Sequence, residues 1–317
     1  MQSLLASTHP YQIFQRERAK GELSHAYLLL CADDELLKEG LKTFAACFFE
    51  GNSRAKSLIE KQSFCDCLFF PKDGKKLSVD DANLIVEEAG IRPIEGDKKV
   101  FVIDGFQTAL PSFQNKLLKI LEEPPEGVYF LIGATTEFSL LPTILSRVKK
   151  LEFAPFITQD IQGYLTRNFP SLSKEESYFF ASASCGKIST AKSFIEEGGY
   201  EETFLDVVTL STASLDKLPA LCKKVAEKGK KELLFSLLEI LFRDAAFLAA
   251  KKGLHSYLFT PFYQKELEKL VYLYPVGVLL DFQKHLREAQ KQLKFNATFA
   301  WCLQILFSNL AAKRKDI

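Results

Sequence analysis

The sequence predicts an α/β domain built on a parallel sheet, followed by a small helical domain and a larger helical domain. Short apolar runs alternate with helical patterns as far as about residue 155, which is the order expected of an α/β domain. The runs are apolar without strict alternation, as in strands that are buried on both faces under crossover helices. After Pro155 the strand signals fade and helical patterns continue to the end of the chain.

Five apolar runs are the expected strands of the sheet. They cover residues 26–30, 67–70, 99–103, 128–134 and 149–153. The stretches between them are the expected helices, at 36–49, 79–90 and 112–123. Ser78 and Gly90 stand where an N-cap and a C-cap are preferred. The third helix is expected to begin behind Ser112 and to stop at Pro124 and Pro125, because proline cannot continue a helix.

The remainder of the chain is expected to be helical and to form two domains. We place the α/β domain at 1–155, a small helical domain at 156–206 and a C-terminal helical domain at 207–317. In the last of these, a long helix ends in Lys and Gly at 251–253, and two further helices cover roughly 275–294 and 296–313. Trp301 is expected in the core of the final helix. The basic tail at 311–315 suits either contact with DNA or a frayed terminus.

The net charge is close to zero but unevenly distributed. Residues 1–206 hold 23 Lys and Arg against 30 Asp and Glu, or −7, and residues 207–317 hold 18 against 10, or +8. This split fits either solvated helix faces of opposite sign or two halves that meet different partners.

Targeting and compartment signals are also readable. The first residues lack the pattern of a signal peptide, and no apolar run approaches the roughly 20 residues of a spanning helix. The seven cysteines are an odd number without a secretion signal, which favours reduced thiols and a cytoplasmic protein with no membrane partner.

Asp104 ends the buried run at 99–103 and is interpreted as the vestige of a metal-binding acid. In phosphate-binding ATPases an acid at this place holds Mg²⁺, and a following Glu activates water. Here the following residue is Gly105. The acid is therefore kept and the expected base is missing.

Three motifs follow in order and carry a family resemblance. They are LLKILEEPP at 117–125, FLIGATT at 130–136 and LLPTILSR at 140–147. Together with HAYLLL at 25–30 they resemble the clamp-loader family of AAA+ proteins. The family's Ser-Arg-Cys tripeptide corresponds to Ser146, Arg147 and Val148. The resemblance implies an AAA+ α/β domain, a helical lid domain and a C-terminal helical collar.

The resemblance also implies a role for Arg147. An arginine on a loop before an edge strand could act as an arginine finger on a nucleotide bound by a neighbouring subunit, with Ser146 positioning the loop. Taken alone, such an arginine more often pairs with a carboxylate on the protein surface. Both interpretations remain open at this stage.

The phosphate loop of the family is not recognisable. The pattern G-x-x-x-x-G-K-[ST] occurs nowhere, and its place after the first strand is taken by CADDELLKEG at 31–40. Around Cys31, Asp34, Leu37 and Lys38 the glycines are gone, and Leu37 stands where the lysine is expected. Asp33, Asp34 and Glu35 would repel a triphosphate.

Two further absences agree with a lost ATP site and a lost zinc module. In the segment from Gly186 to Ala191, Ser189 takes the place of an arginine that senses nucleotide in active relatives. Of the cysteines, only Cys47, Cys65 and Cys67 lie where relatives carry a four-cysteine zinc module, with no evident fourth ligand. We therefore predict no cofactor and no metal.

The resemblance favours the delta-prime class of bacterial DNA polymerase III subunits, in which a degenerate phosphate loop accompanies a kept finger. It implies gamma/tau-type ATPase subunits and a delta-type subunit as partners. The sliding clamp would be met indirectly, and primed DNA through the complex. A delta-type clamp opener and an active AAA+ ATPase are the alternatives, and a nucleotide-independent scaffold is a third.

Overall fold

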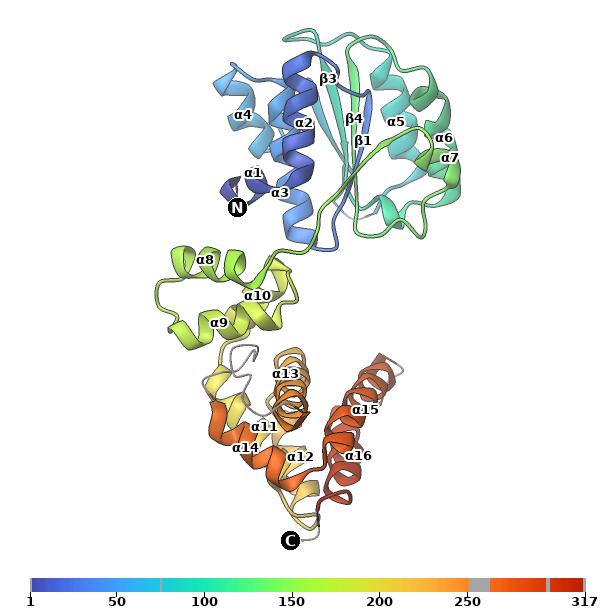
Figure 1. Cartoon of the computed structure of the whole chain (residues 1–317). Coiled ribbons are helices and arrows are strands. Elements are labelled where there is room, and N and C mark those ends of the chain that lie inside the picture. Colours follow the sequence, from blue (N-terminus) through green and yellow to red (C-terminus); the bar gives the residue numbers. More distant parts are fainter. Residues whose placement is uncertain (1, 75, 251–262, 295–296, 316–317) are drawn as a thin grey trace. The chain divides into compact units, whose positions relative to one another are not determined.

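The computed structural model describes residues 2–74, 76–250, 263–294 and 297–315 (Figure 1). The chain forms two compact units. The first contains residues 1–156 together with Lys187–Ser189, and the second contains Ile157–Gly186 and the residues from Thr190 onward. Each unit has its own fold and is described by itself.

The first unit is built on a parallel five-stranded sheet in the order β2-β3-β4-β1-β5. The strands are β1 (Ala26–Leu30), β2 (Cys67–Phe70), β3 (Lys99–Ile103), β4 (Val128–Ala134) and β5 (Lys149–Glu152). All five predicted strands are therefore confirmed, and only the last is one residue shorter than expected. The two edge strands, β2 and β5, are also the shortest.

Helices cover both faces of this sheet (Figure 1). In the first unit they are α1 (Gln2–Ser7), α2 (His9–Lys20), α3 (Asp34–Phe48), α4 (Ser53–Glu60), α5 (Val79–Ala89), η1 (Phe106–Thr108), α6 (Pro111–Glu122) and α7 (Pro142–Leu145). Two hydrophobic cores result, one shared by β-strands with α2, α3 and α4 and the other with α5, α6 and α7. Along β3, Phe101 and Ile103 enter one core while Val100 and Val102 enter the other. This explains why the run is apolar at every position.

The predicted helix ends are partly right. Ser78 caps α5 in a capping box with Asp81, as the sequence indicates. The start of α6 is different, because Pro111 is its first residue and Ser112 lies inside the first turn. Proline is favoured at that position since its missing N–H would have no partner within the helix.

The second unit is helical throughout its described part. Its elements are α8 (Thr158–Asn168), α9 (Lys174–Ala183), most of α10 (Ile188–Glu197), α11 (Tyr200–Thr212), α12 (Leu218–Glu227), α13 (Lys231–Ala250), α14 (Gln264–Leu273), α15 (Val276–Lys294) and α16 (Phe299–Ala311). The predicted fold class, an α/β domain followed by helices, is confirmed. The predicted end of the long helix at 251–253 lies outside the described residues.

The basic tail takes part in the fold of the second unit. Arg314 donates to the Tyr274 hydroxyl at 2.9 Å and to the Ala213 carbonyl at 2.6 Å, and Tyr274 donates to the Ser211 carbonyl at 2.8 Å. These carbonyls end α11, where a cation also suits the helix dipole. Arg314 is thus a structural residue, which the sequence pattern did not indicate.

The prediction for Trp301 is wrong. Its side chain is 56% exposed, because α16 turns Cys302, Leu306 and Phe307 toward the core instead. Ile305, one turn further along the same helix, is also partly exposed. The final helix therefore presents apolar side chains on its outer face.

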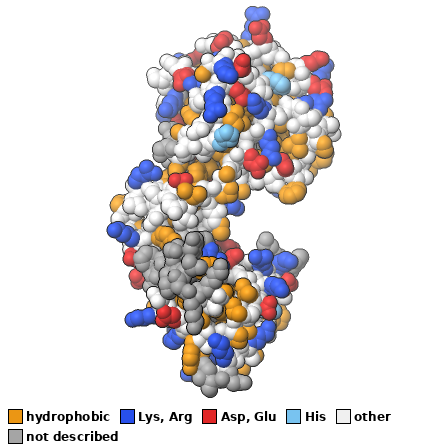
Figure 2. All heavy atoms as spheres, in the orientation of Figure 1, with side chains coloured by type: hydrophobic (Ala, Val, Ile, Leu, Met, Phe, Trp, Pro, Cys, Tyr) orange, Lys and Arg blue, Asp and Glu red, His pale blue; other side chains and the backbone are white. Residues whose placement is uncertain are grey.

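Charged side chains of both signs are interspersed over the visible face of the first unit (Figure 2). On that face the predicted acidic excess does not gather into a single field. Among the described residues, no helix has the length and apolar character needed to cross a membrane.

Candidate functional site

The expected position of a phosphate loop is the connection that follows β1, at the C-terminal edge of the sheet. Only Cys31, Ala32 and Asp33 connect β1 to α3. Cys31 is buried, and burial raises the pKa of its thiol to about 11. The Asp33 carboxylate accepts hydrogen bonds from the amides of Glu35 and Leu36, both at 3.1 Å, and so caps α3. The first turn of this helix is thus satisfied by a side chain of the protein itself.

Leucine side chains fill the position next to this cap. Leu37 is 1% exposed and belongs to the hydrophobic core. A Cβ atom placed on Gly133 of β4 would lie 2.7 Å from a methyl carbon of Leu41 and 3.4 Å from one of Leu37. Both leucines therefore pack directly on the strand. The residue at the expected lysine position points into the core and cannot contact a phosphate.

Lys38 and Lys42 lie beside a small pocket near the same edge. Lys38 donates to Asp34 at 2.9 Å, one turn earlier on α3. The pocket has a volume of about 240 Å³ and is lined in part by both lysines, Phe70 and Asp104. That is below the range of roughly 300–1,000 Å³ typical of ligand sites.

Asp104 ends β3 and lies next to the leucine-filled position. Its Oδ1 accepts the Gly105 amide at 2.7 Å. Burial raises the pKa of the Asp104 carboxyl, and the Gly105 amide and the charge of Lys38 only partly oppose this. Gly105 has a φ of 68°, a conformation that favours glycine over any residue with a side chain. The backbone thus disfavours a glutamate at the expected place of the base.

We expect Asp104→Asn to stabilise the protein at neutral pH. The folded pKa of Asp104 is raised above the unfolded pKa of 3.8, so the protonated carboxyl favours the folded state. This contribution to stability is complete below pH 3.8 and is lost as the pH rises through the folded pKa. The gain from the amide should therefore shrink in acid. Unfolding midpoints across pH 3 to 8 for both proteins, with and without Mg²⁺, provide the measurement. A Mg²⁺-dependent stabilisation of the unmodified protein alone would show that Asp104 still holds a metal.

Arg147 lies at the opposite edge of the sheet. Because all strands are parallel, residues that follow β1 and β3 lie at the C-terminal edge, and a residue that precedes β5 lies at the N-terminal edge. The register pairs Lys149 with Tyr27 and Glu152 with Leu30. Arg147 therefore lies level with the start of β1, while the place of the phosphate loop is beyond its end.

A buried glutamine fixes the segment that carries Arg147. Gln114 of α6 is fully buried, donates to the Ser139 carbonyl at 2.9 Å and accepts the Leu141 amide at 2.8 Å. Leu141 is the N-cap of α7, and Ser146 follows the helix directly. The Ser146 hydroxyl donates to the Thr143 carbonyl at 3.1 Å. Ser146 thus shapes the turn that presents Arg147.

Arg147 has partners within the chain. Its Nε donates to Glu122 at 2.8 Å, a second nitrogen forms an ion pair with the same carboxylate, and a third donates to the Thr143 carbonyl at 2.7 Å. The side chains remain accessible, at 29% for Arg147 and 47% for Glu122. The surface ion pair considered from the sequence is thus present in the chain by itself. Because it is exposed, such a pair contributes little to stability.

Ser189, the residue in the place of the sensing arginine, meets Asp33. Its amide donates to the Asp33 carboxylate at 3.1 Å, and the Ile188 amide donates to the same oxygen. The Asp33 carboxylate therefore accepts hydrogen bonds from the first amides of both α3 and α10. The sequence offered no signal for this contact, since 155 residues separate Asp33 from Ile188.

Similarity to known proteins covers Asp33, Leu37, Asp104 and Arg147 but ends before Ser189. Residues 6–157 match the family model described as DNA polymerase III, delta subunit. The gamma/tau subunit of DNA polymerase III from Mycobacterium tuberculosis is 33% identical over 28% of this chain and 15% of its own length. The delta-prime subunit from Bacillus subtilis is 27% identical over 50% of this chain and 49% of its own. The chain thus spans half or less of the length of these curated relatives.

Residues 6–157 are therefore homologous to DNA polymerase III subunits of the delta-prime and gamma/tau kinds. A solved DNA polymerase III gamma subunit-related protein from Thermotoga maritima is also similar, over 95% of this chain and 99% of that one. Its identity is 16% and its TM-score 0.47, values too low to bear on function.

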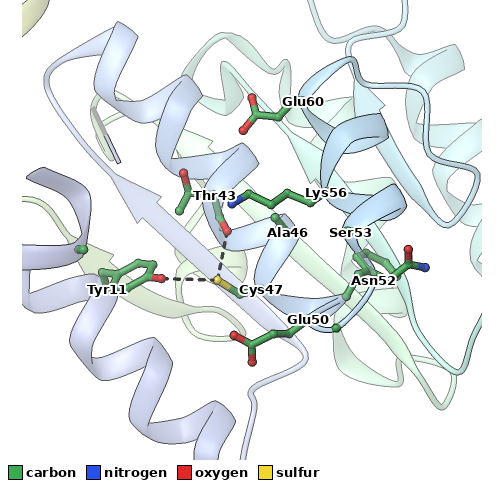
Figure 3. A pocket seen from close by; sticks show the side chains of 12 residues that line it. Tyr11, Thr43, Ala46, Cys47, Glu50, Asn52, Ser53, Lys56 and Glu60 are labelled. Carbon is green, nitrogen blue, oxygen red and sulfur yellow. Dashed lines mark hydrogen bonds between the residues drawn. The ribbon is translucent and has the colours of Figure 1, made fainter. Parts of the chain in front are cut away.

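A pocket occupies the region where relatives carry a zinc module. It has a volume of about 600 Å³ and lies among α2, α3 and α4, with Cys47 on its wall (Figure 3). The Cys47 thiol donates to the Thr43 carbonyl at 3.2 Å and receives a bond from Gln15 at 3.3 Å. Burial raises its pKa, which disfavours the thiolate that zinc requires. Cys65 contacts Glu95 instead. Within the described residues no three potential ligands gather, and the absence of zinc stays a prediction.

Glu122 is the partner that sequence reasoning missed. It belongs to the LEEPP motif that carried the family resemblance, yet nothing in the motif indicates that its carboxylate faces Arg147. The contacts of Gln114, in the same helix, are likewise not indicated by the sequence pattern. Contacts between residues 25 or more positions apart follow from the packing of α6 against α7, which no local pattern encodes.

Proposed function

We propose that this chain is a delta-prime-type subunit of a bacterial DNA polymerase III clamp loader, which does not hydrolyse ATP and donates Arg147 in trans. It would act in the cytoplasm as a stator beside a gamma/tau-type ATPase subunit. The finger would reach that neighbour's ATP while the complex loads a sliding clamp on primed DNA.

The observation that carries this proposal is the position of Arg147. It lies at the N-terminal edge of the sheet, whereas Asp104 and the β1–α3 connection lie at the C-terminal edge. An arginine placed there cannot serve a nucleotide in its own chain. It is accessible and carries a planar fork of donors that matches phosphate oxygens.

The chemistry of the C-terminal edge supports the absence of ATP hydrolysis. Leu37 fills the lysine position, Gly105 fills the position of the base, and the α3 N-terminus is already capped by Asp33. Asp104 alone remains, and a single carboxylate without a bound triphosphate is a poor Mg²⁺ site.

The surface of the second unit supports assembly into a complex. Trp301 is 56% exposed on α16 and Leu280 is 59% exposed on α15. Exposed aromatic side chains such as Trp301 are enriched at protein–protein interfaces. We propose the division 1–155, 156–206 and 207–317, with the last part as the collar that joins gamma/tau-type and delta-type subunits.

We expect the isolated chain to bind no ATP and to assemble with its partners. Titration calorimetry with Mg-ATP should give no heat of binding, and size-exclusion chromatography with gamma/tau-type and delta-type subunits should give one complex. A binding heat at micromolar ATP would contradict the loss of the site, and failure to enter the complex would contradict the assembly.

A delta-type clamp opener is the second candidate, since the matching family model is described as a delta subunit. A clamp opener binds the clamp without its partners, whereas a stator meets it indirectly. A pull-down of isolated clamp by this chain would therefore favour the delta type. An active ATPase, the third candidate, requires the ATP binding that the calorimetry measures.

A further inference from the structure

One buried carboxylate accepts the first amides of two helices. Oδ1 of Asp33 accepts the amides of Glu35 and Leu36 at the start of α3. Oδ2 accepts the amides of Ile188 and Ser189, the first two residues of α10. Asp33 is 4% exposed, so these four bonds lie largely out of water.

Two helix N-termini that converge on one anion form an anion site whose occupant is part of the chain. The first amides of a helix lack partners within the helix, and the helix dipole adds partial positive charge there. This combination is what binds phosphate groups in many proteins. Here the two oxygens of the Asp33 carboxylate already accept hydrogen bonds from these amides.

The contact also holds a distant segment of the chain. Lys187–Ser189 belong to the first compact unit, whereas the flanking residues belong to the second. In this short segment the Ile188 and Ser189 amides both donate to Asp33. A carboxylate that is always present would hold the start of α10 without any ligand.

The acidic residues that follow Asp33 disfavour a second anion, while Lys187 is the cation on the opposite segment whose charge acts on the neighbouring Cys31 thiol. Asp34 and Glu35 follow it directly in the first turn of α3. The nearest lysine on that helix, Lys38, is already paired with Asp34. A phosphate at the two helix ends would have to displace the Asp33 carboxylate and then lie beside these acids.

We propose that Asp33 is a built-in substitute for a nucleotide phosphate, which keeps phosphate away from α3 and holds the Ile188 and Ser189 amides without a ligand. The idea rests on the proposed function, because it explains how a chain without ATP keeps this segment in place. Asp33 is a positioning residue and takes no part in the chemistry at the neighbour's ATP.

Asp33→Ala in the full chain tests the proposal, with hydrogen exchange of the Ile188 and Ser189 amides as the main measurement. Loss of bonds to a charged acceptor should speed their exchange by about tenfold or more. Millimolar inorganic phosphate, at ionic strength matched with chloride, should restore protection in the variant and leave the unmodified protein unchanged.

Two matched variants complete the experiment. Asp34→Ala removes the same charge from the next residue, which is exposed, and should leave both amides as protected as before. Asp33→Asn keeps the size and N-cap ability of the residue, so it remains informative if the alanine variant fails to fold. The asparagine side chain has one oxygen that can accept hydrogen bonds, whereas the carboxylate has two. Either the Ile188 amide or the Leu36 amide should therefore lose its partner and exchange faster.

The outcomes separate this inference from the proposed function. Unchanged exchange at Ile188 and Ser189 in both Asp33 variants would overturn the inference, and so would equal protection of the unmodified chain by phosphate. Binding of ATP by the unmodified chain would instead overturn the proposed function. Hydrogen exchange of the Asp33 variants thus tests the inference, and ATP binding by the unmodified chain tests the proposed function.

Discussion

Replacement of Arg147 by alanine is expected to lower ATP hydrolysis at the neighbouring site by about 10³-fold, the lower end of what arginine fingers contribute. The guanidinium offsets charge that develops on the transferred phosphate, so the loss should appear in turnover rather than in ATP affinity. Single-turnover hydrolysis and clamp loading by the reconstituted complex are the measurements. Total ATPase should fall less, because sites that Arg147 does not serve remain active.

Three variants distinguish a finger from a surface ion pair. Arg147→Lys keeps the charge but loses the fork, and should recover only a small part of the activity. Glu122→Gln breaks the ion pair while it leaves Arg147 in place, and hydrolysis should persist. Arg54→Ala removes another arginine that is paired with a carboxylate in the first unit, and should have no effect on either measurement.

A different pattern would contradict the trans role. If Arg147→Ala leaves hydrolysis and clamp loading unchanged in an intact complex, Arg147 is not a finger. If Arg147→Ala and Glu122→Gln cause the same loss, their ion pair serves assembly or local structure instead. The assembled complex is needed because the isolated chain pairs Arg147 with Glu122.

The strands and most helices could be predicted because their signals are local. Each buried strand is a short apolar run between turn residues, and the predicted runs coincide with β1 to β4. The helix caps were harder, since Ser112 is as good an N-cap by type as Ser78. The proline before Ser112 decides the boundary, because its fixed φ suits the first helical position.

The contacts of the candidate site could not be predicted, because they join residues far apart in the chain. Asp33 was expected to repel phosphate, yet its role as a cap for α10 depends on a segment more than 150 residues later. Trp301 was expected inside because it lies in an apolar helix. Which face of such a helix is buried depends on its neighbours, and α16 buries the faces beside Trp301.

The second large effect is expected from Leu37→Lys, which restores the residue type of a phosphate loop. We expect it to cost about 3 kcal/mol or more of the free energy of unfolding, since burial of an ammonium group costs several kcal/mol and the neighbouring Asp104 carboxylate offsets only part of this. Leu37 packs with Leu41 against Gly133 of β4, and the new side chain would have to replace this packing. ATP binding should not return.

Chemical denaturation measures the loss of stability, and calorimetry with Mg-ATP measures binding. Leu37→Met is the matched control, because it nearly conserves volume and should cost less than about 1.5 kcal/mol. A lysine variant as stable as the control that binds ATP would show that one residue separates this chain from an active site. The buried packing of Leu37 and the cap by Asp33 involve the core and two helix ends at once, so we expect that no single substitution gives ATP binding.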